Sequence, residues 1–64
     1  MHYIIFFPSN RKITVEHYEL DKKNKILKLK NVKMDTNGKK DLNTNIDLTE
    51  VKCLSIDNVK IVLR

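Results

Sequence analysis

The sequence has little of the residues that mark several large protein classes. It holds one cysteine, one glycine and one proline, and it contains no tryptophan, alanine or glutamine. A lone cysteine cannot form a disulfide within the chain, which excludes a disulfide-stabilised framework. No apolar run approaches the ~20 residues that a membrane-spanning helix needs. Because alanine is the strongest helix former, its absence argues against a helical bundle.

Hydrophobic and charged residues dominate what is present. Of the 64 residues, 41% are hydrophobic and 33% are charged. Hydrophobic content this high, arranged in periodic segments, is untypical of a disordered tail. A chain of this length forms one domain, here residues 1–64, and buries roughly 60% of the surface that its unfolded form exposes.

Positive charge is in excess. Thirteen Lys and Arg residues face eight Asp and Glu residues, for a formal net charge of +5, and eleven of the thirteen are lysines. A basic surface favours nucleic acid, an anionic membrane or an acidic protein as partner. Arginine recognises phosphate through two hydrogen bonds, whereas lysine is a hydrated point charge, so the scarcity of arginine weakens the nucleic-acid interpretation.

The first apolar segment runs from Tyr3 to Phe7 and is followed by Pro8-Ser9-Asn10. It is too short for a signal peptide, which also needs a basic segment before it and small residues at a cleavage site. Its aromatic and β-branched residues predict a buried strand. With one cysteine and no export signal, we expect a cytoplasmic protein without membrane association.

Two alternating segments, Ile13 to Leu20 and Lys25 to Met34, predict a β-hairpin. Asparagine is the commonest residue other than glycine in the left-handed region. Placing Asn24 there makes 22–24 a three-residue loop and pairs Asp21 with the residue at position 25.

This register assigns side chains to faces. One face would hold Ile13, Val15, His17, Leu27 and Leu29, and the other would hold Glu16, Tyr18, Lys28 and Lys30. Further along the second strand, Val32 and Met34 fall on the lysine side. Strict alternation does not allow an apolar set to change sides without a slip. We therefore predict a bulge or a strand break near Asn31.

The remaining chain predicts a polar loop and short strands. Residues 35–45 are polar and contain Asn37-Gly38, a strong turn signal. We expect short strands at 46–48, 52–56 and 59–64, with a turn at Asp57-Asn58. A single helical turn near residues 49–52 is compatible with the capping-box pattern that Asp47 begins. A helix over 42–54 ranks lower, because its interior would hold several poor helix formers.

Five or six short strands joined by polar turns predict an all-β fold, either a small barrel or a curled antiparallel sheet. The spacing of the strands is similar to that of SH3-like and OB-like barrels.

Residues that carry chemistry are few. The soft metal ligands are His2, His17 and Cys53, and more than a dozen residues separate each from the next, whereas zinc sites use close pairs. Ser9 and Ser55 lie in no pattern of nucleophilic catalysis. We expect no catalytic residue, no cofactor and no metal.

The lysine-rich stretch is the one candidate binding site. Its members are Lys22, Lys23, Lys25, Lys28, Lys30 and Lys33, with Tyr18 as a stacking platform. Such a surface can follow a nucleic-acid backbone or contact an acidic partner. It is more often a solvated hairpin face, where lysines also discourage edge-to-edge pairing.

The sequence therefore predicts a non-enzymatic protein-interaction module, such as an accessory or inhibitor protein that occupies a partner's surface. The alternative is a nucleic-acid-binding small β-barrel that uses the lysine-rich hairpin. The apolar segment at 59–63 also predicts a homodimer if it lies on a sheet edge.

Overall fold

The computed structural model of the chain describes residues 1–38 and 42–63. These residues form six antiparallel strands in one sheet and no helix. The strands are β1 (His2–Phe7), β2 (Arg11–Asp21), β3 (Ile26–Asp35), β4 (Asn43–Asp47), β5 (Cys53–Ile56) and β6 (Val59–Val62). The prediction of an all-β protein is confirmed.

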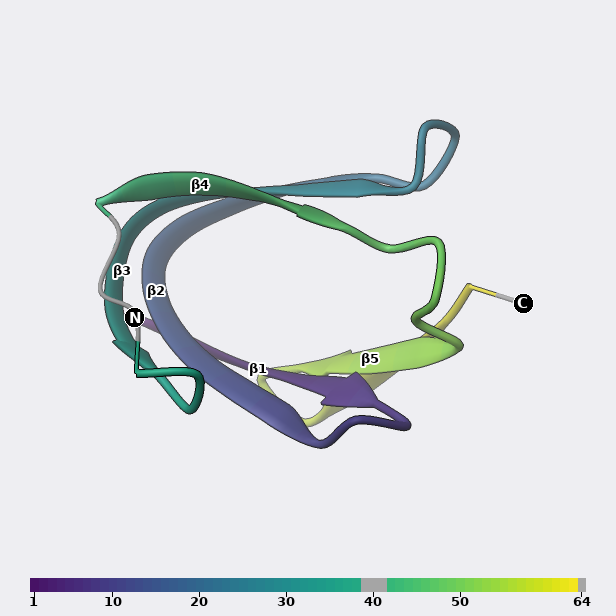
Figure 1. The fold of residues 1–64 in the computed structure, drawn as a ribbon, viewed down its shortest axis with the longest axis horizontal. Coiled ribbons are helices and arrows are strands. Elements are labelled where there is room, and N and C mark those ends of the chain that lie inside the picture. The colour runs from purple at the N-terminus through teal and green to yellow at the C-terminus, as the bar shows by residue number, and fades with distance from the viewer. Residues whose placement is uncertain (39–41, 64) are drawn as a thin grey trace.

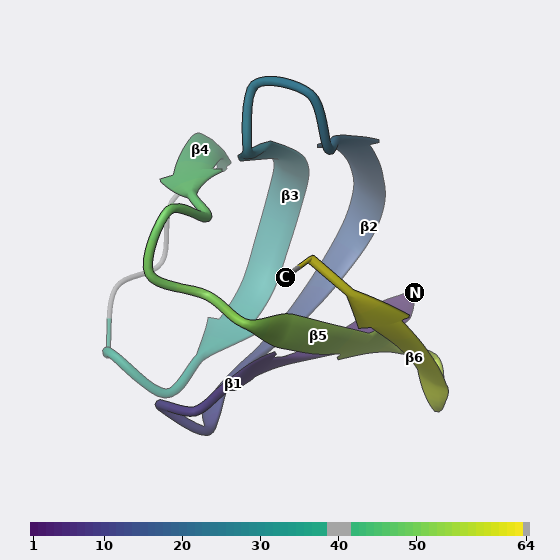
Figure 2. The ribbon, with the colours of Figure 1, turned by 90° about the vertical axis from the view of Figure 1, so that its right-hand side faces the viewer.

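The sheet is strongly curled and stays open. Its strand order is β4-β3-β2-β1-β5-β6, so β4 and β6 are the two edges. Figure 1 shows β2 and β3 bending round so that β4 lies across the interior from β5, and Figure 2 shows the same curl from the side. Of the two predicted forms, the described residues adopt the curled antiparallel sheet.

The core lies inside this curl and receives side chains from almost every strand. Its buried members are Ile4, Phe6, Ile13, Val15, Leu27, Leu29, Val32, Leu48, Leu54 and Ile56. Leu48 follows β4 directly, and its N–H donates a 2.8 Å hydrogen bond to the carbonyl of Lys25. The turn after β4 thereby closes over one end of the core.

The curl has a local cause in β2 and β3, where both strands change the side that faces the core. In β3 the buried side chains are Leu27 and Leu29 and then Val32, so the alternation slips between positions 29 and 32. Asn31 lies in this interval with a φ of 57°, in the left-handed region. The register also shifts opposite Thr14 and Val15, where β3 holds one extra residue. The predicted bulge near Asn31 is confirmed.

Glu16 secures the bend from the neighbouring strand. The Asn31 Nδ2 donates a 2.8 Å hydrogen bond to Glu16 Oε2, and the Nζ of Lys33 lies 3.7 Å from the same carboxylate oxygen. Asparagine tolerates the left-handed region better than most residues because its short side chain can hydrogen-bond locally.

The predicted hairpin register is wrong by one residue. Asp21 pairs with Ile26, so the loop is the four residues 22–25, and the left-handed residue is Lys25 (φ 54°) instead of Asn24. The Asp21 side chain stabilises this longer loop, because its Oδ1 and Oδ2 accept hydrogen bonds from the N–H and Nδ2 of Asn24. A loop that is longer by one residue places every later residue of the hairpin opposite a different partner.

The shifted register also changes the predicted faces, because one residue of slip moves side chains to the other face of a sheet. His17 lies opposite Lys30 and is exposed, not on the core face with Leu29. Tyr18 lies opposite Leu29, on the core side. The face of the hairpin that carries Lys28 and Lys30 therefore holds His17, where Tyr18 was expected.

The other turns follow the sequence more closely. Asp57 and Asn58 have φ values of 51° and 69° and form the two-residue turn between β5 and β6, as predicted. Positive φ at both positions is the signature of a type I′ hairpin turn. After β4, the N–H of Val51 bonds to the carbonyl of Leu48 in a single turn, so the short helical turn predicted near 49–52 is an isolated turn one residue earlier.

The polar segment 35–45 is shorter as a loop than expected, because β3 ends at Asp35 and β4 begins at Asn43. Gly38 has a φ of 76°, and its N–H bonds to the carbonyl of Asp35, so the predicted Asn37-Gly38 turn begins as expected. Its continuation at residues 39–41 lies outside the described residues. The helix considered over 42–54 is not formed, because strands β4 and β5 occupy this segment.

Carboxylates tie the ends of strands together. Arg11 at the start of β2 donates from Nε to Asp35 Oδ1 at the end of β3 (3.1 Å) and from its guanidinium to Oδ2, so the two groups pair in parallel. Asp57 joins the β5–β6 turn to β1, with His2 Nδ1 at 2.7 Å from its Oδ2 and the Tyr3 N–H donating to its Oδ1 at 2.9 Å. The His2 hydrogen bond and then the Tyr3 N–H lower the pKa of Asp57.

We expect substitutions of Asn31 to separate backbone conformation from hydrogen bonding. Asn31→Ala places a methyl side chain in the left-handed region, which costs about 1 kcal/mol, and removes a hydrogen bond worth about 0.5–1.5 kcal/mol. Asn31→Gly removes the hydrogen bond but keeps the conformation accessible. Urea unfolding should therefore rank stability as wild type, then Asn31→Gly, then Asn31→Ala. An Asn31→Ala protein as stable as Asn31→Gly would show that the left-handed residue does not set the bend.

We expect Asp57 to contribute to stability in a pH-dependent way. Its pKa is lower in the folded chain, so its contribution is complete above the unfolded value of about 3.9 and is lost as the pH falls through the lower folded pKa. Asp57→Asn keeps a residue that tolerates positive φ but removes the charge. The variant should be less stable at pH 7 and should lose less stability on acidification, as measured by urea unfolding at a series of pH values. The exposed Glu50→Gln serves as charge control, and equal acid slopes for wild type and Asp57→Asn would contradict this role.

Candidate functional site

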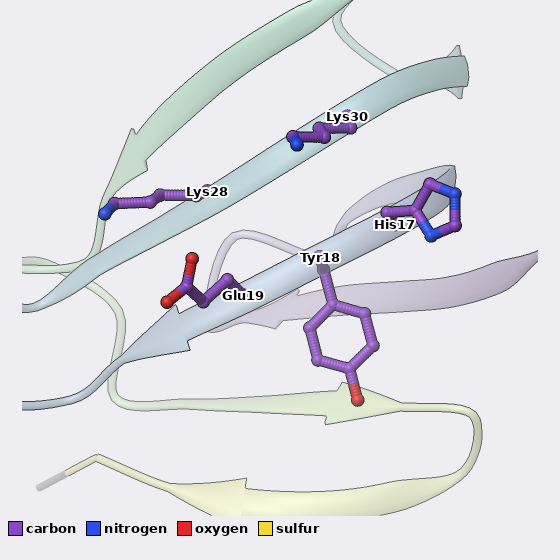
Figure 3. A pocket seen from close by; sticks show the side chains of 5 residues that line it. All are labelled: His17, Tyr18, Glu19, Lys28 and Lys30. Carbon is purple, nitrogen blue, oxygen red and sulfur yellow. The ribbon is translucent and has the colours of Figure 1, made fainter.

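The outer face of β2, β3 and β4 carries two straight rows of polar side chains. Cross-strand pairing aligns Glu19 with Lys28 and Asn45 in one row, and His17 with Lys30 and Asn43 in the next. His17, Glu19, Lys28 and Lys30 line a shallow hollow together with part of Tyr18. Figure 3 shows the two lysines on β3 beside Glu19 and His17 on β2. Two of the six predicted lysines therefore lie side by side in this face.

Tyr18 lines the same hollow, but its ring points away from the two lysines, and its predicted role as a stacking platform stays a prediction. Its ring lies on the other side of β2 from Lys28 and Lys30, as Figure 3 shows. There it packs edge-on against the His2 ring, with 4.9 Å between centroids and 85° between planes. The ring of Tyr18 is thus directed toward His2 and not toward the two lysines.

The other predicted lysines are divided between the loop and the bend. Lys22, Lys23 and Lys25 are exposed in the β2–β3 loop, at the end of the hairpin. Lys33 lies beyond the bend, where it forms its ion pair with Glu16. The predicted lysines therefore form a cluster in the β2–β3 loop and a pair on the outer face of β3, Lys28 and Lys30. Lys33 lies apart from both groups.

Acidic groups moderate the charge of the lysine row. Lys28 lies directly opposite Glu19. The pKa of Asp21 is lowered, first by the Asn24 N–H and side-chain amide and then by the charge of Lys28. Because Glu19 and Asp21 lie near Lys28, this surface presents less net positive charge to a phosphate backbone than the composition suggests.

The candidates for metal binding and catalysis are dispersed. Cys53 lies opposite Phe7 on one side and Val62 on the other, and His17 lies opposite Lys30. Within residues 1–38 and 42–63, no three His, Cys, Asp or Glu side chains gather where they could hold a metal ion. In the same residues, no helix has the length and apolar character to cross a membrane.

A second candidate surface lies at the β6 edge. β6 is the last strand of the sheet, and Val59 and Val62 are 64% and 57% exposed. Beside it, the outer face of β1 and β5 has a hollow whose lining is mostly apolar. The residues that line it are Phe7, Pro8, Cys53, Ser55 and Lys60.

The β6 edge offers backbone hydrogen-bonding groups as well as apolar side chains. The two-residue turn pairs Ile56 with Val59, and the N–H of Leu63 donates to the carbonyl of Lys52 at 3.0 Å. In an antiparallel pair, bonded residues alternate along the strand, so positions 59, 61 and 63 bond to β5. The N–H and C=O groups of Lys60 and Val62 therefore point away from the sheet.

The opposite edge of the sheet is different. β4 presents Asn43, Asn45 and Asp47 to solvent on its outer face, and only Thr44 and Ile46 turn inward, both half-buried. An edge with this composition discourages further pairing, whereas β6 has valine on both faces. The sequence indicated that 59–63 was apolar, but the strand order alone reveals that it is an edge.

Comparisons of the chain with protein-family models, with curated proteins and with solved structures find no match. The function is therefore inferred from the geometry of these two surfaces. The resemblance in spacing to SH3-like and OB-like barrels stays a prediction.

We expect the free energy of unfolding to depend more strongly on the charge at Lys28 than on the charge at Lys30. Lys28→Glu sets two carboxylates opposite each other, which destabilises a strand pair by roughly 0.2–1 kcal/mol. Lys30→Glu faces His17 and should change the free energy of unfolding less. The charge swap Lys28→Glu with Glu19→Lys should recover the loss in urea unfolding. If the swap is as unstable as the single variant, the two side chains do not interact.

Proposed function

We propose that this protein is a non-enzymatic protein-interaction module that binds by adding a strand of its partner to the β6 edge. The observation that carries the proposal is the open β6 edge, with its exposed valines and its outward backbone groups at Lys60 and Val62. Strand addition obtains affinity from main-chain hydrogen bonds and specificity from pockets for alternate side chains.

The neighbouring hollow supports this proposal. Val62 lies opposite Cys53, and Cys53 lies opposite Phe7, so the three side chains form one row on the outer face that ends at the free edge. A strand paired with β6 would set every second side chain on this outer face, one of them directly beside Val62. The partner strand would then contact apolar side chains and also form hydrogen bonds with the free backbone groups of β6. These are the two kinds of contact that strand addition uses.

Occupying a partner's surface requires no chemistry from this chain. A module of this kind acts by covering a strand that the partner would otherwise use, or by extending the partner's sheet. This role agrees with the small size of the domain, because a 64-residue chain supplies few side chains beyond its core.

A proline at position 60 tests the proposed edge. The N–H of Lys60 points away from β5, so Lys60→Pro removes a donor that a partner would use while it spares the β5–β6 hydrogen bonds. Lys60→Thr is the matched control, since it removes the same charge but keeps the N–H. The partner is captured on immobilised wild-type protein, identified by mass spectrometry and purified for calorimetry.

We expect Lys60→Pro to weaken binding of the purified partner about tenfold or more, because an unsatisfied acceptor costs roughly 1–3 kcal/mol. Lys60→Thr should stay within a few fold of wild type. Circular dichroism and urea unfolding of both variants check that the fold is kept. Equal affinity for the two variants would reject the β6 edge as the binding element.

A nucleic-acid-binding function is the second candidate, and the exposed lysines of the β2–β3 loop and of the outer row favour it. Its test is fluorescence anisotropy of labelled DNA and RNA at low and physiological salt. Binding by this surface should fall steeply with salt, because phosphate contacts release counterions. Nucleic-acid binding should be lost in the double variant Lys23→Glu/Lys30→Glu and kept in Lys60→Pro. Absence of binding at low salt rejects this candidate.

A further inference from the structure

We infer that the strand which pairs with β6 is β6 of a second copy of this chain, antiparallel and centred on Ile61. The inference rests on the proposed function, because it names the occupant of the same edge. It joins two six-stranded sheets into one continuous sheet through a twofold axis. Closed twofold dimers are the commonest homo-oligomers, and their interface must be self-complementary.

Backbone geometry allows such a pairing. Lys60 and Val62 both present their N–H and C=O groups at the free edge. With the two-fold axis at Ile61, Lys60 of one copy exchanges two hydrogen bonds with Val62 of the second copy. By symmetry, Val62 of the first copy and Lys60 of the second copy exchange two more hydrogen bonds. All outward groups of these two residues are then satisfied.

The arrangement of side chains selects one register. Directly opposite residues in an antiparallel pair share a face, so the axis must pass through a residue of β6 and not between two residues. An axis at Lys60 sets two lysines against each other. An axis at Val59 or at Val62 leaves the outward groups of Lys60 without a partner in β6 of the second copy. Like charges directly opposite destabilise a pair. Among the four residues of β6, only Ile61 as the axis avoids the like-charge contact and gives Lys60 a partner in β6.

The Ile61 register also matches apolar side chains on both faces. On the core side, Ile61 meets Ile61 of the second copy, and Val59 meets Leu63. On the outer side, the methylene chain of Lys60 lies along Val62 of the second copy, while the ammonium group of Lys60 stays in water. The exposed Val59 and Val62 thereby gain apolar neighbours that the single chain does not give them.

Charge distinguishes a second copy from an acidic partner strand. Each copy carries a formal charge of +5, so two copies repel each other at long range. Salt screens this repulsion, and the dimer should therefore strengthen as ionic strength rises. An acidic strand held beside Lys60 would instead bind more weakly at high salt. The direction of the salt dependence reports which occupant is present.

Cysteine crosslinking tests the register. In a Cys53→Ser background, cysteine is introduced singly at positions 59, 60, 61 and 62, and disulfide formation is followed by non-reducing gel electrophoresis. In the inferred register, Ile61→Cys brings two thiols directly opposite each other in a pair without backbone hydrogen bonds, where the strands approach most closely. We expect it to crosslink at least tenfold faster than Lys60→Cys, Val62→Cys or Val59→Cys.

Analytical ultracentrifugation of the unmodified chain tests the dimer without any substitution at position 61. We expect a monomer–dimer equilibrium that tightens with salt, and Lys60→Pro should shift it to monomer while Lys60→Thr does not. Circular dichroism of each variant confirms that it is folded. A monomer at every concentration and salt, or faster crosslinking at position 60 or 62, would overturn the inference.

The same measurements separate this inference from the proposed function. A monomer that still binds a purified protein in a Lys60→Pro-sensitive manner keeps the β6 edge as the site and rejects the second copy. A dimer that is unchanged in Lys60→Pro forms through another surface and rejects the inference. If no association of any kind responds to Lys60→Pro, both fail.

Discussion

The bend that Asn31 and Glu16 form across β3 and β2 is the feature on which the rest of the structure depends. A left-handed residue in one strand, hydrogen-bonded to a carboxylate on the next, lets both strands change the side that faces the core. Without that change, Val32 and Leu29 could not both be buried, and the long hairpin would remain flatter. The curl encloses a core that a small flat sheet could not bury on one side.

The curl also gives the sheet two unlike edges. It brings the short polar strand β4 across the interior from β5 (Figure 1), while β6 forms the other edge, beside β5. Of these two edges, β6 is the more apolar, and its Val59 and Val62 are exposed. A domain whose core is small gains from covering such an edge, which connects the stability of the fold to its proposed function as an interaction module.

Local patterns predicted the parts of the structure that depend on neighbours in sequence. The alternation of Val59 and Ile61, the Asp57-Asn58 turn and the conflict of sides near Asn31 each indicated what the structure shows. The hairpin register was wrong because two loops differing by one residue fit the same pattern. Asp21 selects the longer loop through hydrogen bonds that neither residue type nor spacing reveals. The longer loop places His17 and Glu19, instead of Glu16 and Tyr18, on the face of Lys28 and Lys30.

The sequence by itself determined that the chain is all-β, that it carries excess positive charge, where most strands lie and that one strand is bent. These properties follow from composition and from the two-residue period of side chains. Only the tertiary structure decided which strands are edges, which side His17 and Tyr18 face and how far the sheet closes. The faces of His17 and Tyr18 depend on the exact length of the β2–β3 loop, and the edges and the closure depend on pairings between distant residues, such as Ile4 with Ile56. The two-residue period of side chains encodes neither.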